Sequence, residues 1–212
     1  MSQEAVMLRY QEIVNEIDLE VQRLRKERGG SPCPLNCFDC CRSTATMAIS
    51  EAEAQDLKEG LRKLSKEVRS HIAKKANRSI QKLEQLGYST ENITRDAGIE
   101  AIDALKGKPE AQCPMLIGGV CSVYEHRPII CRVWGYPIDN GSELACCKKT
   151  FIGRRRLFKP IEYARYWREA RDLSESLGAK QKTPNCYLVV RLLAEIDREE
   201  LWENKGNESS GK

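Results

Sequence analysis

The residues of this 212-residue chain that are best suited to chemistry are its ten cysteines. Nine lie between positions 33 and 147, in two groups followed by an adjacent pair. The first group is Cys33-x3-Cys37-x2-Cys40-Cys41, the second is Cys113-x7-Cys121-x9-Cys131, and the pair is Cys146-Cys147. Cysteines two or three residues apart can turn both sulfurs toward one ion, and thiolates bind zinc, iron and iron–sulfur clusters. We therefore expect a metal centre held by thiolates.

Metal binding explains this grouping better than disulfides or core packing. The chain opens with Met1-Ser2-Gln3-Glu4 and further charged residues rather than an export signal, so we expect a cytoplasmic protein whose thiols stay reduced. Four thiols within nine residues of a Pro-containing loop are too many for simple packing. Cys186 lies in a helical pattern and is expected to be a small buried hydrophobe, while the roles of Cys146 and Cys147 stay open.

Several thiolates around one or two ions carry excess negative charge, so cations are expected beside them. Arg42, Arg127 and Arg132 lie close to cysteines in the sequence, and we hypothesise that they neutralise the site and donate hydrogen bonds to sulfur. Cys40-Cys41 is a special case because adjacent side chains diverge in an extended chain. The pair serves one ion only if the backbone kinks; otherwise it serves two metals, or one ligand and one reactive thiol.

Histidines contribute little to the expected site. His71 falls in a helical pattern and is expected to be solvated, and His126 is expected to be a loop residue rather than a ligand.

The elements that must position these loops are helices. Residues 1–30 form an amphipathic helix with a narrow apolar seam, which needs a partner helix and ends at Gly29-Gly30. Ser50 followed by Glu53 is a capping box that begins a long helix over 51–86, either continuous or broken near Asn77. The Gly118-Gly119 dipeptide predicts a small hairpin.

We predict a mostly α fold in which helices pack around an irregular Cys-rich metal-binding centre with a short β-hairpin. The expected segments are an N-terminal amphipathic helix (1–30), a Cys-rich domain (31–150), a C-terminal helical pair (151–203, its second helix starting at Thr183-Pro184) and a disordered tail (204–212).

Composition excludes few partners by itself. The formal charge of +4 on 35 basic and 31 acidic residues is close to balance, and no apolar run approaches the roughly 18 residues of a membrane span, so no membrane partner is expected. Arg154-Arg155-Arg156, with Lys148 and Lys149 nearby, raises nucleic acid as a partner, but a solvated basic face is the simpler explanation. The expected partners are a metal ion and a protein that contacts the N-terminal helix.

The cysteine boxes resemble the YkgJ-like cysteine-cluster family of zinc- or iron-chelating domains. Its CxxxCxxCC-type box matches Cys33 to Cys41, and its later box, C-P-x-L-x-x-G-x-C-x-(V/I)-Y-E-x-R-P-x-x-C-R, matches Cys113 to Arg132, so the likeness covers about residues 31–135. The resemblance implies metal binding by Cys33, Cys37, Cys40, Cys41, Cys113, Cys121 and Cys131. It also marks Arg127 and Arg132 as family positions.

The leading hypothesis is a metal-binding protein that holds zinc or iron, as a mononuclear or an iron–sulfur centre. The first alternative is an iron–sulfur enzyme, because the family is similar to part of the flagellin lysine N-methylases and because Cys33-x3-Cys37-x2-Cys40 has the spacing of radical S-adenosylmethionine enzymes. No succession of strand–helix units accompanies that spacing. The second alternative is a zinc-stabilised nucleic-acid-binding module. The residues assign no substrate and no reaction.

Overall fold

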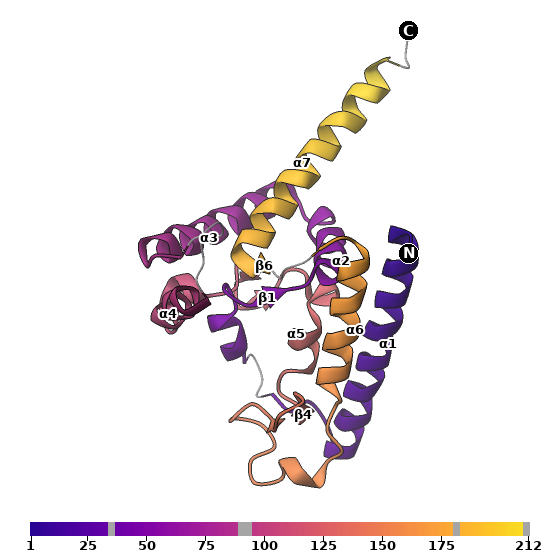
Figure 1. The fold of residues 1–212 in the computed structure, drawn as a ribbon, viewed down its shortest axis with the longest axis vertical. Coiled ribbons are helices and arrows are strands. Elements are labelled where there is room, and N and C mark those ends of the chain that lie inside the picture. The colour runs from indigo at the N-terminus through magenta and orange to yellow at the C-terminus, as the bar shows by residue number, and fades with distance from the viewer. Residues whose placement is uncertain (34–36, 89–94, 180–182, 210–212) are drawn as a thin grey trace. The chain divides into compact units, whose positions relative to one another are not determined.

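The computed structural model describes residues 1–33, 37–88, 95–179 and 183–209; the side chains of 95–98 and 203–209 also lie outside this description. Most of the described residues are helical, which confirms the predicted mostly α fold (Figure 1). The α-helices are α1 (Gln3–Arg28), α2 (Glu51–Arg62), α3 (Lys66–Gln85), α4 (Arg95–Leu105), α5 (Ile129–Val133), α6 (Tyr163–Ser176) and α7 (Asn185–Ser209). Short 3-10 turns are η1 (Asp39–Ser43), η2 (Pro109–Ala111), η3 (Tyr124–His126) and η4 (Arg155–Leu157). In the described part of the chain, no helix has the length and apolar character needed to cross a bilayer.

The strands form short antiparallel pairs. They are β1 (Ala48–Ile49) with β6 (Thr183–Pro184), β2 (Leu116–Ile117) with β3 (Val120–Cys121), and β4 (Ile138–Asp139) with β5 (Leu144–Ala145). The β2–β3 pair is the predicted hairpin, with Leu116 opposite Cys121. Its turn residues, Gly118 and Gly119, have φ of 57° and 80°, and positive φ at both central positions is the requirement of a type I′ turn.

The chain divides into two compact units, each built from three separate stretches. Unit 1 contains residues 1–37, 50–57 and 125–182, and unit 2 contains residues 38–49, 58–124 and 183–212. The sequence analysis expected consecutive segments instead. The division matters for the cysteines, because a unit boundary falls inside the early box. Cys33 and Cys37 belong to unit 1, and Cys40 and Cys41 belong to unit 2.

In unit 1, helix α1 packs against α5 and α6 (Figure 1). It begins at Ser2, whose hydroxyl accepts a hydrogen bond from the Ala5 amide at 3.2 Å, and ends at Gly29 with φ of 83°. The seam predicted from the sequence is buried; its buried members are Tyr10, Val14, Ile17, Val21 and Leu24. The helices that cover this seam therefore come from the same unit.

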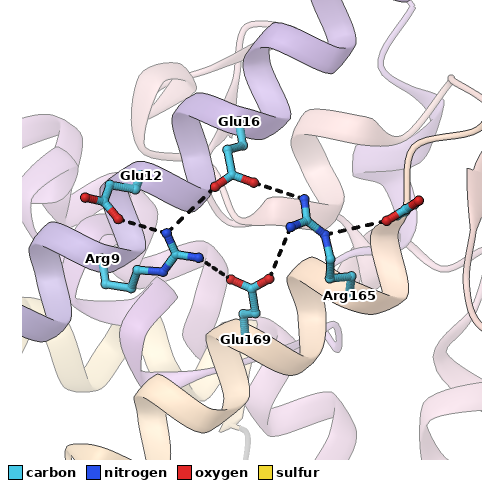
Figure 2. A network of polar contacts seen from close by, with 6 residues as sticks. Arg9, Glu12, Glu16, Arg165 and Glu169 are labelled. Atoms are coloured by element: carbon cyan, nitrogen blue, oxygen red, sulfur yellow. Dashed lines mark hydrogen bonds and ion pairs between the residues drawn. The ribbon is translucent and has the colours of Figure 1, made fainter.

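A charge network joins the outer faces of α1 and α6 (Figure 2). Arg9 pairs with Glu12 on its own helix at 2.8 Å and with Glu169 on α6 at 2.7 Å. Arg165 on α6 pairs with Glu16 on α1 at 3.0 Å. Each pair is partly exposed and contributes about 0 to 1 kcal/mol, so the network orients the two helices more than it stabilises them.

The capping box at the start of α2 also organises unit 1. Glu53, which is buried, accepts hydrogen bonds from the Ser50 amide at 2.9 Å and the Ser50 hydroxyl at 2.6 Å, as predicted. Its other oxygen accepts from the Ile129 amide at 3.1 Å, at the start of α5. One carboxylate thus holds the beginnings of two helices.

In unit 2, α3 packs against α7 through buried residues such as Ile72, Leu192 and Ile196. The ion pair between Arg69 and Glu200, at 2.7 Å, joins the same two helices. The amide of Asn185, the first residue of α7, donates to the Met47 carbonyl at 2.9 Å and fixes the start of that helix.

Three expectations about helix limits were wrong. The helix expected over 51–86 is two helices, and it breaks before Ser65 rather than near Asn77, because the Ser65 hydroxyl accepts from the Val68 amide and caps α3. Thr183 and Pro184 pair with β1 instead of starting the last helix. That helix, α7, continues to Ser209, through most of the tail expected to be disordered, while residues 210–212 lie outside the described residues.

We predict that Glu53→Ala lowers the free energy of unfolding by about 2 to 4 kcal/mol, because three buried donors lose their acceptor together. Urea unfolding followed by circular dichroism measures this loss. The control is Glu59→Ala in the same helix, whose carboxylate pairs with Arg62 on the exposed surface, and it should change stability by no more than about 0.5 kcal/mol. Equal losses in the two variants would show that Glu53 has no organising role.

Candidate metal centre

Unit 2 places four of the predicted ligands on irregular backbone. Cys40 and Cys41 lie in η1, Cys113 follows η2, and Cys121 ends β3. The Cys113 amide donates to the Cys41 carbonyl at 2.7 Å, and the Ala45 amide donates to the Ala111 carbonyl at 3.0 Å. These bonds hold the end of the early cysteine box directly beside the start of the later one.

An aromatic contact ties the hairpin to the same region. The Phe38 ring lies against the hairpin turn, 3.4 Å from the position that a Cβ on Gly119 would take. The Arg42 guanidinium lies 5.1 Å from the centre of that ring and 3.6 Å from the Asp39 carboxylate. Arg42 was predicted to neutralise the thiolates, and the structure shows it on an aromatic face and a carboxylate instead.

The adjacent cysteines are closer together than an extended chain allows. The 3-10 turn of η1 brings the Cys40 and Cys41 sulfurs to 4.0 Å from each other. Two sulfurs at tetrahedral positions around a zinc ion, each about 2.3 Å from it, lie about 3.8 Å apart. A hydrogen bond with the Cys41 thiol lowers the pKa of Cys40 to about 6, which favours the thiolate that a metal requires.

Cys113 occupies the buried side of this group. The Asn185 side-chain amide donates to the Cys113 sulfur at 3.7 Å and to the Thr44 carbonyl at 3.1 Å. Asn185 is only 1% exposed, so this donor is fixed. Burial raises the pKa of the Cys113 thiol, and the Asn185 hydrogen bond acts against that rise. Asn185 was not identified from the sequence.

Lys75 of α3, a cation whose charge interacts with Cys113 and Cys41, was not identified from the sequence. Its Nζ donates to the Leu116 carbonyl in the hairpin. Burial lowers the Lys75 pKa, and the charges of Cys113 and Cys41 oppose that effect. The available signal was its spacing: Lys75 lies three residues after Ile72 and four before Ser79, which are both buried, so it shares the inward face of α3.

Unit 1 contains the other predicted ligands. Cys131 lies in α5, and Cys37 precedes the boundary of the unit. The Cys33 sulfur lies 3.1 Å from the position that a Cβ on Gly135 would take. The Cys146 sulfur is 3.8 Å from the Gly135 carbonyl oxygen, so Cys33 and Cys146 both contact Gly135.

Cys146 and Cys186 lie outside the predicted ligand set, and burial raises the pKa of both thiols. Burial raises the pKa of Cys146, which packs partly against the core and lies 3.3 Å from the Thr150 hydroxyl. Cys186 is fully buried, and burial raises its pKa to about 12. Cys186 therefore has the environment of a small core residue, as the sequence indicated.

Arg132 is engaged within unit 1. Its guanidinium pairs with Asp18 at 3.0 Å and donates to the carbonyls of Arg127 and Glu125. These acceptors are all oxygens, and the side chain is 3% exposed, so Arg132 stabilises the fold of unit 1.

The two histidines belong to different units. His126 Nδ1 lies 3.0 Å from the buried Asp56 carboxylate within unit 1, and His71 is exposed on α3. Among the described residues, no three His, Cys, Asp or Glu side chains are gathered tightly enough to hold an ion. The Cys40 and Cys41 sulfurs lie 4.0 Å apart and the Cys113 backbone bonds to that of Cys41, but the described thiols do not form an assembled coordination sphere.

Comparison with known proteins gives one match. Residues 32–144, more than half of the chain, match the family model described as "CxxCxxCC: Putative zinc- or iron-chelating domain". No curated protein and no solved structure gives a significant match. The matched range contains both cysteine boxes and ends before Cys146.

We predict that Gly119→Val lowers the free energy of unfolding by about 1 to 3 kcal/mol. A β-branched residue is strained at a φ of 80°, and its methyl groups extend beyond a Cβ that is already in contact with the Phe38 ring. Thermal and urea unfolding measure the loss. Gly118→Asn is the matched control, because no atom lies within 4 Å of a Cβ at that position and asparagine tolerates a positive φ. A valine variant as stable as the asparagine variant would contradict the contact.

Proposed function

The chain belongs to the CxxCxxCC family of zinc- or iron-chelating domains, and from this premise we propose that it binds zinc or iron through cysteine thiolates. The family description supports metal chelation in general and does not identify the metal or its ligands. The proposed ligands are Cys33, Cys37, Cys40, Cys41, Cys113, Cys121 and Cys131. The proposal for individual residues depends most on the thiols of unit 2.

The observation that carries the proposal is the sulfur geometry of η1. The Cys40 and Cys41 sulfurs are 4.0 Å apart, which is close to the separation of two ligands on one zinc ion. Cys113, whose amide bonds to Cys41, and Cys121 at the end of the hairpin supply two further thiols in the same unit. Four thiolates close the coordination shell of a structural zinc, and soft thiolates also suit iron–sulfur clusters.

The surroundings of these thiols fit a metal centre. Four thiolates around a divalent ion leave a net negative charge, and Lys75 supplies a positive charge beside Cys113 and Cys41. Asn185 donates to the Cys113 sulfur, a contact that lowers the cost of an ionised thiol in a buried place. A bound metal would supply a link between the early loop and the hairpin.

The radical S-adenosylmethionine alternative has no support in the fold. In the described part of the chain the strands form two-stranded antiparallel pairs, whereas that chemistry is expected on a barrel of parallel strands. A colourless zinc protein and a brown iron–sulfur protein remain distinct forms of the same proposal.

We predict that protein purified without oxygen contains zinc or iron in a fixed ratio to the chain, and that Cys40→Ser and Cys121→Ser each lose most of it. Neither cysteine is buried, so both variants should keep the helical content of the wild type by circular dichroism. Elemental analysis, acid-labile sulfide and the visible spectrum identify the metal. Cys186→Ala is the matched control and should keep full metal content. Full metal content in either serine variant would remove that residue from the ligand set.

We predict that Lys75→Met weakens metal binding about 10-fold or more, because the thiolates lose their neighbouring cation. Competition with a chelator of known affinity measures the change. Lys74→Met removes the same charge from the preceding position of α3, which is exposed, and should leave the metal affinity unchanged. An equal effect of the two substitutions would show that Lys75 acts only through net charge.

A further inference from the structure

The strongest feature outside the metal centre is a run of positive charge in unit 1. Residues 146–160, here called the basic loop, contain six basic side chains and no acidic one. They are Lys148, Lys149, Arg154, Arg155, Arg156 and Lys159. This local charge exceeds the formal net charge of +4 of the whole chain. The basic loop therefore attracts anions, although the chain as a whole is nearly balanced.

Two large aliphatic side chains flank the arginines of the basic loop and are open to solvent. Ile152 is 76% exposed and Leu157 is 77% exposed. Exposure of single apolar residues is ordinary, but here two of them lie within a dense group of cations. The same short segment thus offers charge to an anionic surface and apolar area to a less polar layer.

The inner side of the basic loop is anchored. Phe151 is 6% exposed, and its ring contacts Phe158 edge to face with 4.9 Å between centroids. The Thr150 hydroxyl donates to the Gly135 carbonyl at 2.6 Å. Phe151 has a φ of 48°, the only positive φ of a non-glycine residue in the described part of the chain. Such strained conformations persist where packing enforces them, so the packing of Phe151 anchors the backbone of the basic loop.

The cations of the basic loop also border a cavity. Lys148, Arg155 and Arg156 line an open pocket of about 460 Å³, in the size range of small-molecule sites. A phosphate-bearing headgroup fits its charge.

We propose that the basic loop docks on an anionic phospholipid surface. The cations contact lipid phosphates and carboxylates, and Ile152 and Leu157 enter the boundary between headgroups and acyl chains. Nucleic acid offers similar phosphates but no apolar layer for these side chains. Stacking on bases would require an open aromatic ring, but of the two rings in the loop Phe151 is buried and Phe158 packs against it. A peripheral contact of this kind requires no membrane-spanning helix. The expectation of no membrane partner depended on the lack of such a helix, so it does not apply to this contact. The proposal is also independent of the metal proposal.

The test is co-sedimentation of the purified full-length chain with phosphatidylcholine vesicles, with and without phosphatidylserine. We expect binding to the anionic vesicles only, with affinity falling as salt rises. Arg154→Glu/Arg156→Glu should reduce the partition coefficient at least about 25-fold, since each cation contributes about 5-fold. Lys74→Glu/Arg78→Glu, two reversals on the exposed face of α3, should leave most of the binding intact. Equal losses in both reversal variants would overturn the proposed location.

The apolar residues separate lipid from other anions. Ile152→Ser/Leu157→Ser keeps every charge and should lower vesicle binding about 10-fold or more, while leaving any binding to single-stranded polyuridylate unchanged. All substituted side chains are exposed, so circular dichroism should show unchanged folding. Vesicle binding that is unaffected by the serine pair would overturn the proposal. So would binding to polyuridylate in the absence of binding to the anionic vesicles.

Discussion

The hydrogen bond from the Cys113 amide to the Cys41 carbonyl is the constraint on which the thiol arrangement of unit 2 depends. It joins positions 41 and 113 along the chain, so it closes a long loop that contains α2, α3 and α4. Helix α3 supports this closure, because the Ser79 hydroxyl on its buried face donates to the Glu110 carbonyl at 2.6 Å, just before the later cysteine box. The helices thus fix the two loops, and the loops carry the sulfurs.

The anionic group that a cation contacts in this chain does not follow from its distance to that group along the sequence. Arg132 directly follows Cys131, yet its guanidinium bonds to Asp18 and to two carbonyls. A carboxylate or carbonyl oxygen is a harder and more strongly accepting partner for a guanidinium than a thiol is. Lys75, far from both boxes in sequence, lies beside Cys113 and Cys41 instead. Which cation meets which anion is a property of tertiary packing.

The same distinction explains what could be predicted from the sequence. The α1 seam, the Ser50–Glu53 capping box and the Gly118-Gly119 hairpin are local patterns, and the structure contains each of them. The break before Ser65 was missed because apolar residues on both sides continue a helical period, while the serine cap interrupts it. Asn185 and Lys75 were missed because their roles come from segments remote in sequence. Local patterns therefore predicted these elements, whereas the contacts around the sulfurs depend on tertiary packing.

The cysteines of unit 2 differ in their exposure to solvent. Cys40 is exposed and its pKa is lowered, whereas Cys113 is buried and its pKa is raised. In the proposed metal site, the lowered pKa of Cys40 favours its thiolate, whereas burial opposes ionisation of Cys113. Asn185 and Lys75 lower the cost of that ionisation. The 3-10 turn holds the Cys40 and Cys41 sulfurs 4.0 Å apart, so in the proposed site the early box presents two sulfurs at a spacing close to that of two ligands on one zinc ion.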